Sequence, residues 1–274
     1  MVAKNNVFYN IYSRSYDLAL IIDDINIPVA PIRAKVCALV MLEPSSILSY
    51  PSRYIDQFEH SFSFQPIPIG VTKSRYVQCN VGAPPSFFPP LPPKRCRSSE
   101  LLIINSNKVI TMGHRKRTNF IKQLVTNLNV PFVVFGRGFR DFDSKAALLS
   151  EYQYSLAIEN EISEFYVSEK LYDCWAAKTF PFYIGGSVVG KEEEEGLLTR
   201  LDLNDPVYSA KLINQIVGDQ NVLNKYYKVV DDFFSFYISQ LLFSNKIPKN
   251  IELNSNLKSR KSHYKIIFSK RFCR

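Results

Sequence analysis

The sequence lacks any uninterrupted apolar run of about 18 residues, the length that a membrane-spanning helix requires. The residues after Met1 read Val-Ala-Lys-Asn-Asn and contain no apolar stretch of the signal-peptide type. These absences predict that the protein stays on the cytosolic side of a membrane, or that the chain is a fragment that has lost its targeting segment.

Cysteine is also scarce, and its arrangement argues against two kinds of structural cross-link. The five cysteines are scattered, odd in number and never spaced as Cys-x-x-Cys. A disulfide framework or a structural zinc site would need paired spacings. The sequence therefore predicts idle or buried thiols at Cys37, Cys79, Cys96, Cys174 and Cys273.

A complete dinucleotide-binding glycine motif is missing as well. Gly136-Arg137-Gly138 follows an apolar run, but Asp141 stands where the third glycine of Gly-x-Gly-x-x-Gly would lie. These glycines are better explained by a tight turn, with ligand contact as the alternative. The pair Asp141 and Asp143 invites a metal reading, yet no further carboxylate nearby completes a hard-metal shell. We predict no metal site.

Positive charge is concentrated at the end of the chain. The net charge is +9, but residues 246–274 hold nine Lys or Arg against Glu252, which leaves +1 for residues 1–245. Because the body is near neutral, we predict no nucleic-acid partner. Residues 258–274 mix basic with aromatic side chains, which predicts a peripheral contact with an anionic membrane surface. A disordered solubilising tail is the alternative.

The sequence divides into four segments. Residues 1–83 contain two apolar runs, Leu18–Ile22 and Ala34–Leu42, that predict buried strands. Residues 84–93 contain six prolines, which cannot continue a helix or a sheet ladder. We therefore expect an N-terminal lobe over 1–83, a linker over 84–100, a second lobe over 101–245 and a basic tail over 246–274. A Pro-x-x-Pro ligand for a partner domain is the other interpretation of the proline-rich stretch.

The second lobe alternates strands and helices, which is the pattern of a parallel sheet covered on both faces and predicts a Rossmann-like domain. The strands are expected near 101–104, 132–135, 155–159 and 182–184, and the helices near 115–128, 144–150, 167–178, 207–217 and 222–243.

One strand-to-helix junction carries a carboxylate beside an ammonium. Asn160 ends the strand, Tyr166 is expected to open the helix, and Glu169 and Lys170 fall in its first turn. Such junctions present ligand-binding groups in α/β sheets. The pair suits a ribose hydroxyl next to a phosphate, although a solvated surface pair is the common fate of such residues.

A basic run from His114 to Arg117 lies at the start of another predicted helix. Cations there oppose the helix dipole at a cost of roughly 0.3–1 kcal/mol each. A bound anion would relieve that conflict, and Arg117 would lie near a phosphate at this terminus. A solvated basic turn is the alternative.

These motifs together resemble the α1,3/1,4-fucosyltransferases of glycosyltransferase family ten. The resemblance is carried by residues 100–186, through Asn105–Lys108, Arg117–Leu124, Val133–Gly138, Tyr154–Asn160, Tyr166–Leu171 and Phe180–Gly185. It implies an α/β, GT-B-like fold of two Rossmann-like lobes facing a cleft, here with an abbreviated N-terminal lobe.

The resemblance also implies an inverting transfer of L-fucose from GDP-β-L-fucose to an acceptor oligosaccharide or glycolipid, with no metal or other cofactor. Arg117 and Lys170 match the family's diphosphate-binding cations, Glu169 its ribose-binding carboxylate, and Asn160 and Tyr166 its donor-site lining. The acceptor is expected to contain N-acetylglucosamine, joined in α1,3 or α1,4 linkage. The location implied is cytoplasmic, peripheral on the inner membrane face, or Golgi for a eukaryotic fragment.

An inverting displacement needs a base for the acceptor hydroxyl, and the family supplies a carboxylate from its N-terminal lobe. Glu43 follows the apolar run Ala34–Leu42 and precedes Pro44, so it is the candidate base. A surface glutamate before a turn proline is the competing interpretation. Asp56 and Glu59 are the other candidates.

Overall fold

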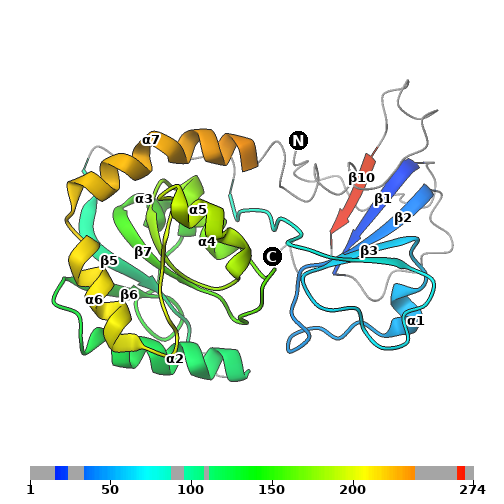
Figure 1. The fold of residues 1–274 in the computed structure, drawn as a ribbon, viewed down its shortest axis with the longest axis horizontal. Helices are drawn as coiled ribbons and strands as arrows, with labels where there is room; N and C mark the ends of the chain where they lie inside the picture. The colour runs from blue at the N-terminus through cyan, green and yellow to red at the C-terminus, as the bar shows by residue number, and fades with distance from the viewer. Residues whose placement is uncertain (1–15, 24–33, 88–95, 108–110, 238–263, 269–274) are drawn as a thin grey trace. The chain divides into compact units, whose positions relative to one another are not determined.

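The computed structural model describes residues 16–23, 34–87, 96–107, 111–237 and 264–268. The chain divides into two compact units (Figure 1). Unit 1 combines Met1–Val81 with Leu242–Arg274, and unit 2 is Gly82–Leu241. Each unit contains a five-stranded sheet in which every described strand pair is parallel. The predicted α/β class with two Rossmann-like units is thus confirmed.

Unit 1 is built around a strand that is apolar on both faces. Its sheet has the order β10 (Tyr264–Phe268), β1 (Tyr16–Ile22), β2 (Ala34–Met41), β3 (His60–Ser63) and β4 (Arg75–Gln78). Residues 18–22 of β1 are fully buried, as expected for an inner strand of a parallel sheet. The short helix α1 (Ser52–Ile55) places Tyr54 and Ile55 in a core cluster with residues of β1 and β2.

The C-terminal segment supplies a strand to unit 1. β10 lies within the segment 246–274 that was expected to be a basic tail, and it pairs in parallel with β1, from Leu18 opposite Tyr264 to Ile22 opposite Phe268. The tail prediction therefore missed a structural element. β10 pairs with β1 because the edge of β1 that faces away from β2 carries backbone N–H and C=O groups that need partners. The backbone of a short apolar segment can provide those partners. Residues 246–263 and 269–274 lie outside the described residues.

The sheet of unit 2 has the order β6 (Phe132–Phe135), β5 (Ser98–Ile104), β7 (Tyr152–Ile158), β8 (Phe180–Ile184) and β9 (Thr199–Arg200). Its strand β5 begins inside the segment 84–100 that was expected to be a linker. Residues 84–87 of the proline-rich stretch belong to unit 2, whereas residues 88–95 lie outside the described part of the chain.

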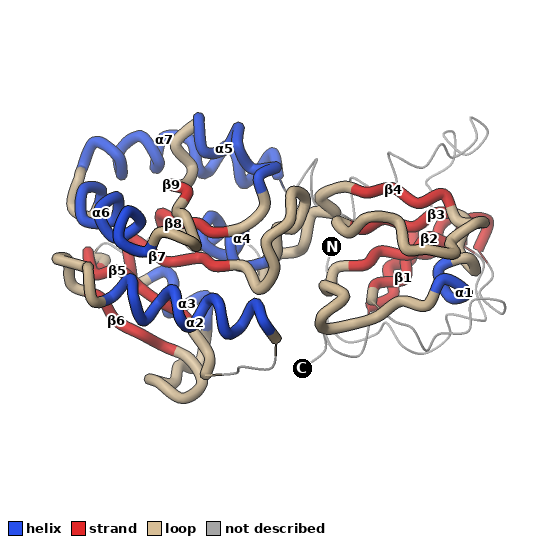
Figure 2. Tube along the Cα trace, turned by 60° about the horizontal axis from the view of Figure 1, so that its bottom comes forward, coloured by secondary structure: helices blue, strands red, loops and turns tan. Residues whose placement is uncertain are grey.

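The helices of unit 2 form two groups on opposite sides of this sheet (Figure 2). They are α2 (Met112–Val125), α3 (Lys145–Ser150), α4 (Glu169–Ala176), α5 (Gly190–Glu194), α6 (Pro206–Ile216) and α7 (Gln220–Phe236). Helix α2 packs against α6, while α3 and α7 pack against α4.

Two connections of unit 2 run in opposite directions across the sheet. Helix α2 leads from β5 to β6 on one side of β5, and α4 leads from β7 to β8 on the other side. Because β5 and β7 are neighbours, the topological switch point lies between them. In open α/β sheets, ligands bind at the carboxyl ends of the strands at such a point.

Candidate functional site

The start of helix α2 lies against the carboxyl end of β7 at the switch point. Arg117 on α2 donates a hydrogen bond from a terminal nitrogen to Asn160 Oδ1 at 2.5 Å. The helix start approaches closely because Gly113 has no side chain: a Cβ there would lie 1.7 Å from the Asn160 carbonyl oxygen. The glycine therefore lets α2 place Arg117 against the end of β7.

Arg117 lies deeper than the sequence predicted. Helix α2 begins at Met112, after the N-cap Thr111, so Arg117 falls in the second turn and not in the first. Its side chain is buried, its Nε has no hydrogen-bond partner among the described residues, and burial lowers its pKa. A guanidinium holding one unused buried donor beside a strand terminus is suited to an anionic ligand.

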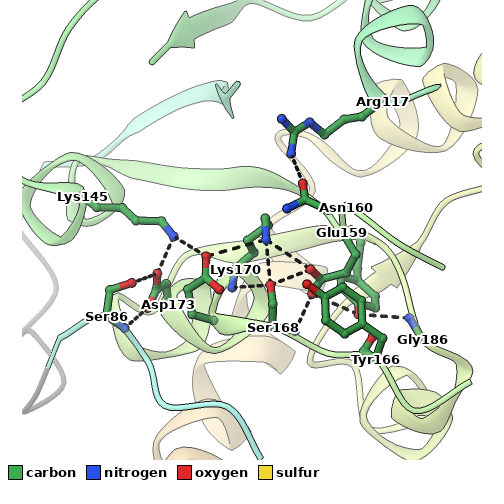
Figure 3. A network of polar contacts seen from close by, with 12 residues as sticks. Ser86, Arg117, Lys145, Glu159, Asn160, Tyr166, Ser168, Lys170, Asp173 and Gly186 are labelled. Carbon is green, nitrogen blue, oxygen red and sulfur yellow. Dashed lines mark hydrogen bonds and ion pairs between the residues drawn. The ribbon is translucent and has the colours of Figure 1, made fainter. Parts of the chain in front are cut away.

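Lys170 lies in the first turn of α4, where it contacts the end of β7 (Figure 3). Its Nζ is 3.3 Å from Glu159 Oε2 and 2.8 Å from Ser168 Oγ. Burial lowers the pKa of Lys170, but the carboxylates of Glu169 and Glu159 outweigh that effect and raise it. The ammonium is therefore charged at neutral pH and is anchored to the strand that carries Asn160.

Glu159 is the anchor of this arrangement. Its carboxylate is buried and accepts hydrogen bonds from the Ser168 backbone N–H at 2.8 Å and from Ser168 Oγ at 2.5 Å. Ser168 is in turn the N-cap of α4. These bonds fix the helix start to the strand end, so they set the positions of Glu169 and Lys170.

Glu169 keeps its charge in this setting. Burial raises the pKa of its carboxyl, but the ammonium groups of Lys170 and Lys145 outweigh that effect and lower the pKa to about 2. Its side chain is 41% exposed. A carboxylate that is both ionised and accessible can accept hydrogen bonds from the hydroxyl groups of a ligand.

Tyr166 lies in the turn before α4 and does not open the helix, which begins at Glu169. Its ring is buried, and its carbonyl oxygen accepts a hydrogen bond from Gly186 N at 3.2 Å. A Cβ on Gly185 would lie 2.1 Å from Tyr183 Oη and 2.6 Å from Glu159 Cγ. The two glycines after β8 thus allow this strand end to approach the turn that carries Tyr166.

The family to which this chain belongs is decided by a family model. The model of glycosyltransferase family 10 (fucosyltransferase), C-terminal region, matches residues 97–267, more than half of the chain. The chain belongs to glycosyltransferase family 10. The resemblance noted in the sequence is thereby confirmed, and so is the assignment of this protein to an enzyme family.

Two crystal structures of α1,3-fucosyltransferases are similar to this family 10 chain. A crystal structure of an α1,3-fucosyltransferase with GDP is 15% identical over 83% of this chain and 79% of that chain, with a TM-score of 0.49. Another, of an α1,3-fucosyltransferase with GDP-fucose, is 12% identical over 87% of this chain and 94% of that chain, with a TM-score of 0.48. No curated protein sequence matches the chain.

Five of the six predicted site residues of this family 10 chain lie in unit 2. The structure brings together Arg117, Asn160, Tyr166, Glu169 and Lys170 around the carboxyl end of β7, and Figure 3 shows all of them except Glu169 with labels. Their roles toward a donor stay predictions. Sequence reasoning did not single out Glu159, although its place as the last residue before Asn160 at a strand end is a usable signal.

The sixth residue, Glu43, lies in unit 1 after β2. It is half-buried, its backbone N–H donates to Asp23 Oδ1 at 3.3 Å, and its carbonyl accepts from Gln65 Nε2 at 3.1 Å. The alternative Asp56 is less suited to be a base. Its oxygens accept the backbone N–H groups of residues 72–74, bonds that lower its pKa. Glu59 is exposed.

Asp23 is a residue that the sequence reasoning missed. It directly follows β1, lies beside Glu43, has a positive φ of 48° and is buried. Its Oδ1 accepts hydrogen bonds from Leu42 N at 2.6 Å and from the Tyr50 hydroxyl. Burial raises its pKa to about 6 in spite of these bonds. A buried carboxyl directly after an apolar strand is the signal that could have identified it.

The described residues contain neither a cluster of metal ligands nor a membrane-spanning helix. No group of three or more His, Cys, Asp or Glu side chains within them could hold a metal ion, and Asp141 and Asp143 are exposed. No helix among the same residues is long and apolar enough to cross a membrane.

Proposed function

We propose that this protein transfers L-fucose from GDP-β-L-fucose to a hydroxyl group of an acceptor glycan, with inversion at the anomeric carbon. One observation carries the proposal: two cationic side chains from different helices, Arg117 and Lys170, contact the consecutive residues Asn160 and Glu159 at the end of β7. Two fixed cations at a switch point suit a diphosphate.

In the proposed reaction the acceptor oxygen attacks the anomeric carbon of fucose while the bond to the β-phosphate oxygen breaks. The electron pair of that bond leaves with GDP, and the proton of the acceptor hydroxyl passes to Glu43. Arg117 and Lys170 offset the negative charge that grows on the departing GDP. Glu169 accepts hydrogen bonds from the ribose hydroxyls, while Asn160 and Tyr166 line the donor site.

The geometry is compatible with donor binding by Lys170. Its ammonium has three hydrogens, and its short contacts to Ser168 and Glu159 do not exhaust them. The diphosphate would take a further donor from Lys170 and one from the terminal nitrogens of Arg117, which carry more N–H groups than the bond to Asn160 uses. The proposal needs no metal to neutralise the leaving group, because both cations come from the chain.

A donor panel tests this function. Calorimetric titrations should give tighter binding of GDP-fucose than of GDP-mannose or a UDP-sugar. Mass spectrometry should then detect fucose on acceptors that contain N-acetylglucosamine, with α1,3 or α1,4 linkage. Preference for another nucleotide sugar would favour a different transferase of the same fold. Tight GDP-fucose binding without transfer to any acceptor would favour an inactive nucleotide-sugar-binding or glycan-binding protein.

The peripheral membrane contact of residues 246–274, with a cytoplasmic location at the inner membrane face, stays a prediction. Deleting this segment would remove β10 and disturb the sheet of unit 1. A better test replaces Lys258, Arg260 and Lys261 by glutamine and measures co-sedimentation with anionic vesicles. Each charge contributes about 1 kcal/mol near such a surface, so binding should weaken clearly. Equal binding of both proteins would contradict the prediction.

A further inference from the structure

A buried ion pair lies one helical turn beyond Glu169. Asp173 on α4 is fully buried, and Lys145 Nζ approaches its Oδ2 to 2.5 Å. Glu169 and Asp173 are four residues apart, so both carboxylates lie on the same face of α4. Lys145 comes from a different helix, α3, and is therefore placed by the tertiary fold.

Lys145 also reaches the predicted ribose-binding carboxylate. Its Nζ is 3.9 Å from Glu169 Oε1, and Lys170 Nζ is 3.6 Å from the same oxygen. The two ammonium groups therefore lie within 4 Å of one carboxylate oxygen. The side chain of Glu169 is partly open to solvent, so without these cations it would be free to adopt other rotamers.

The position of Lys145 is unfavourable for reasons of local structure alone. It is the first residue of α3, after the N-cap Ser144, where a cation opposes the helix dipole. Burial lowers the pKa of its ammonium, but the carboxylates of Asp173 and Glu169 outweigh that effect and raise it. The lysine is therefore held in its charged form by these two acids.

Asp173 is itself fixed by a third segment. Ser86 donates its backbone N–H to Asp173 Oδ1 at 2.6 Å and its hydroxyl to Oδ2 at 2.7 Å. With Lys145, three donors thus hold this carboxylate. A buried acid with all these partners cannot rotate freely, so it provides a rigid base for Lys145.

We propose that Lys145 is a positioning residue of the donor site: anchored by Asp173 and Ser86, it orients the Glu169 carboxylate for the ribose hydroxyls of the bound nucleotide. This role rests on the proposed function, in which Glu169 binds the ribose. Orientation before binding removes part of the entropic cost of ordering the side chain.

The test compares two nucleotides that differ only at the ribose. Calorimetry gives the affinity of the full chain for GDP and for 2′,3′-dideoxy-GDP. The main variant, Lys145→Met with Asp173→Asn, removes both charges together and so avoids leaving one buried charge unpaired. Asparagine at 173 can still accept from Ser86 N and donate to Ser86 Oγ. Lys178→Met is the matched control, because Lys178 forms an ion pair of 2.6 Å with Asp231 and contacts none of these residues.

The wild-type protein should prefer GDP by about tenfold or more, the effect of hydrogen bonds to a charged acceptor. The double variant should lose about tenfold in GDP affinity while its affinity for the dideoxy nucleotide stays within about twofold. Adding Glu169→Gln to the double variant should cause no further loss of GDP affinity, since the effects of substitutions at coupled residues are not additive. Lys145→Arg should keep most of the preference, and Lys178→Met all of it.

Different results would overturn different claims. A folded double variant that keeps the wild-type preference for GDP overturns the positioning role alone. Equal losses for both nucleotides also overturn it, because Lys145 would then act on the diphosphate or on the whole site. A wild-type protein that binds GDP no better than the dideoxy nucleotide overturns the ribose role of Glu169 as well, and one that binds neither overturns the proposed function.

Discussion

The two parallel sheets of this protein carry acidic side chains at their carboxyl ends in opposite electrostatic surroundings. In unit 2, Glu169 lies between two ammonium groups, and its pKa falls to about 2. In unit 1, Asp23 is buried beside another acid, Glu43, and its pKa rises to about 6. The described contacts of Asp23 are to two backbone N–H groups and one hydroxyl, and they include no cation.

This difference matches the two tasks that the proposed function gives to the two units. A carboxylate that stays ionised at every physiological pH is fitted to bind hydroxyl groups next to a diphosphate. A buried carboxyl whose described contacts include no cation has a raised pKa, and groups that titrate closer to neutrality are suited to proton transfer. We therefore expect variants of unit 2 to change nucleotide affinity and variants of unit 1 to change the rate of transfer or its pH dependence.

The largest expected effect is on transfer. Glu43→Gln should lower the rate by about 10²–10⁴-fold, because the acceptor proton then has no base, while the affinity for GDP stays unchanged. Single-turnover transfer and GDP calorimetry measure the two quantities. A normal rate would exclude Glu43 as the base and direct attention to Glu59→Gln. A loss of GDP affinity would break the division of tasks between the units.

A smaller effect is expected for Lys170→Met. The variant should bind GDP about 10–100-fold more weakly, since a charge-assisted contact to the diphosphate is lost. Ser168 would still hold the Glu159 carboxylate with two hydrogen bonds. Lys178→Met again serves as the control and should bind GDP normally. If both variants bind GDP equally well, Lys170 is not a diphosphate ligand.

The third prediction concerns the pH dependence of stability that Asp23 produces. Its pKa is 3.8 in a model compound and about 6 in the folded protein. Between these values the folded state holds a proton that the unfolded chain has released, so stability falls as the pH rises through this range. The predicted loss is roughly 3 kcal/mol, and Asp23→Asn should lack it.

Urea unfolding of both proteins at several pH values from 4 to 7, followed by circular dichroism, measures this difference. The wild-type free energy of unfolding should fall relative to that of Asp23→Asn until the pH passes the folded pKa of about 6, and the difference should then stay constant. Parallel curves would mean that folding does not raise the pKa of Asp23, and the contrast with Glu169 would be lost.

The smallest effect is expected for Tyr50→Phe. It removes a hydrogen bond to the Asp23 carboxylate, worth about 1 kcal/mol, and this bond lowers the pKa of Asp23. The same pH series should therefore place the end of the stability loss above pH 6. Tyr76→Phe is a matched control in unit 1, because the Tyr76 hydroxyl donates to the Gln65 carbonyl instead. An unshifted profile for Tyr50→Phe would show that its hydroxyl does not influence Asp23.

The strand-to-helix alternation predicted most of unit 2. Strand β6 has the predicted ends, and β5, β7, β8 and α3 lie within a few residues of theirs, because periodic apolar patterns report burial directly. Helix α2 was predicted three residues too late, since its Thr111 cap and its side-chain bond with His114 were not recognised. That shift is why Arg117 was expected in the first turn.

Other features were beyond the reach of local patterns. The pairing of β10 with β1 joins residues more than two hundred positions apart, and a short basic and apolar segment reads equally well as a membrane-binding tail. The contact of Ser86 and Lys145 with Asp173 joins three segments that no spacing rule connects. Such contacts depend on how the elements pack.

By itself the sequence determined the α/β class, the apolar strands and the placement of Asn160, Glu169 and Lys170 at one strand-to-helix junction, because the spacing of apolar residues and the position of a junction are local properties of the chain. The tertiary structure alone decided which charges face one another. Glu169 and Asp23 are ordinary acids in the printed sequence, and only the groups that folding packs around them lower the pKa of one carboxyl and raise that of the other.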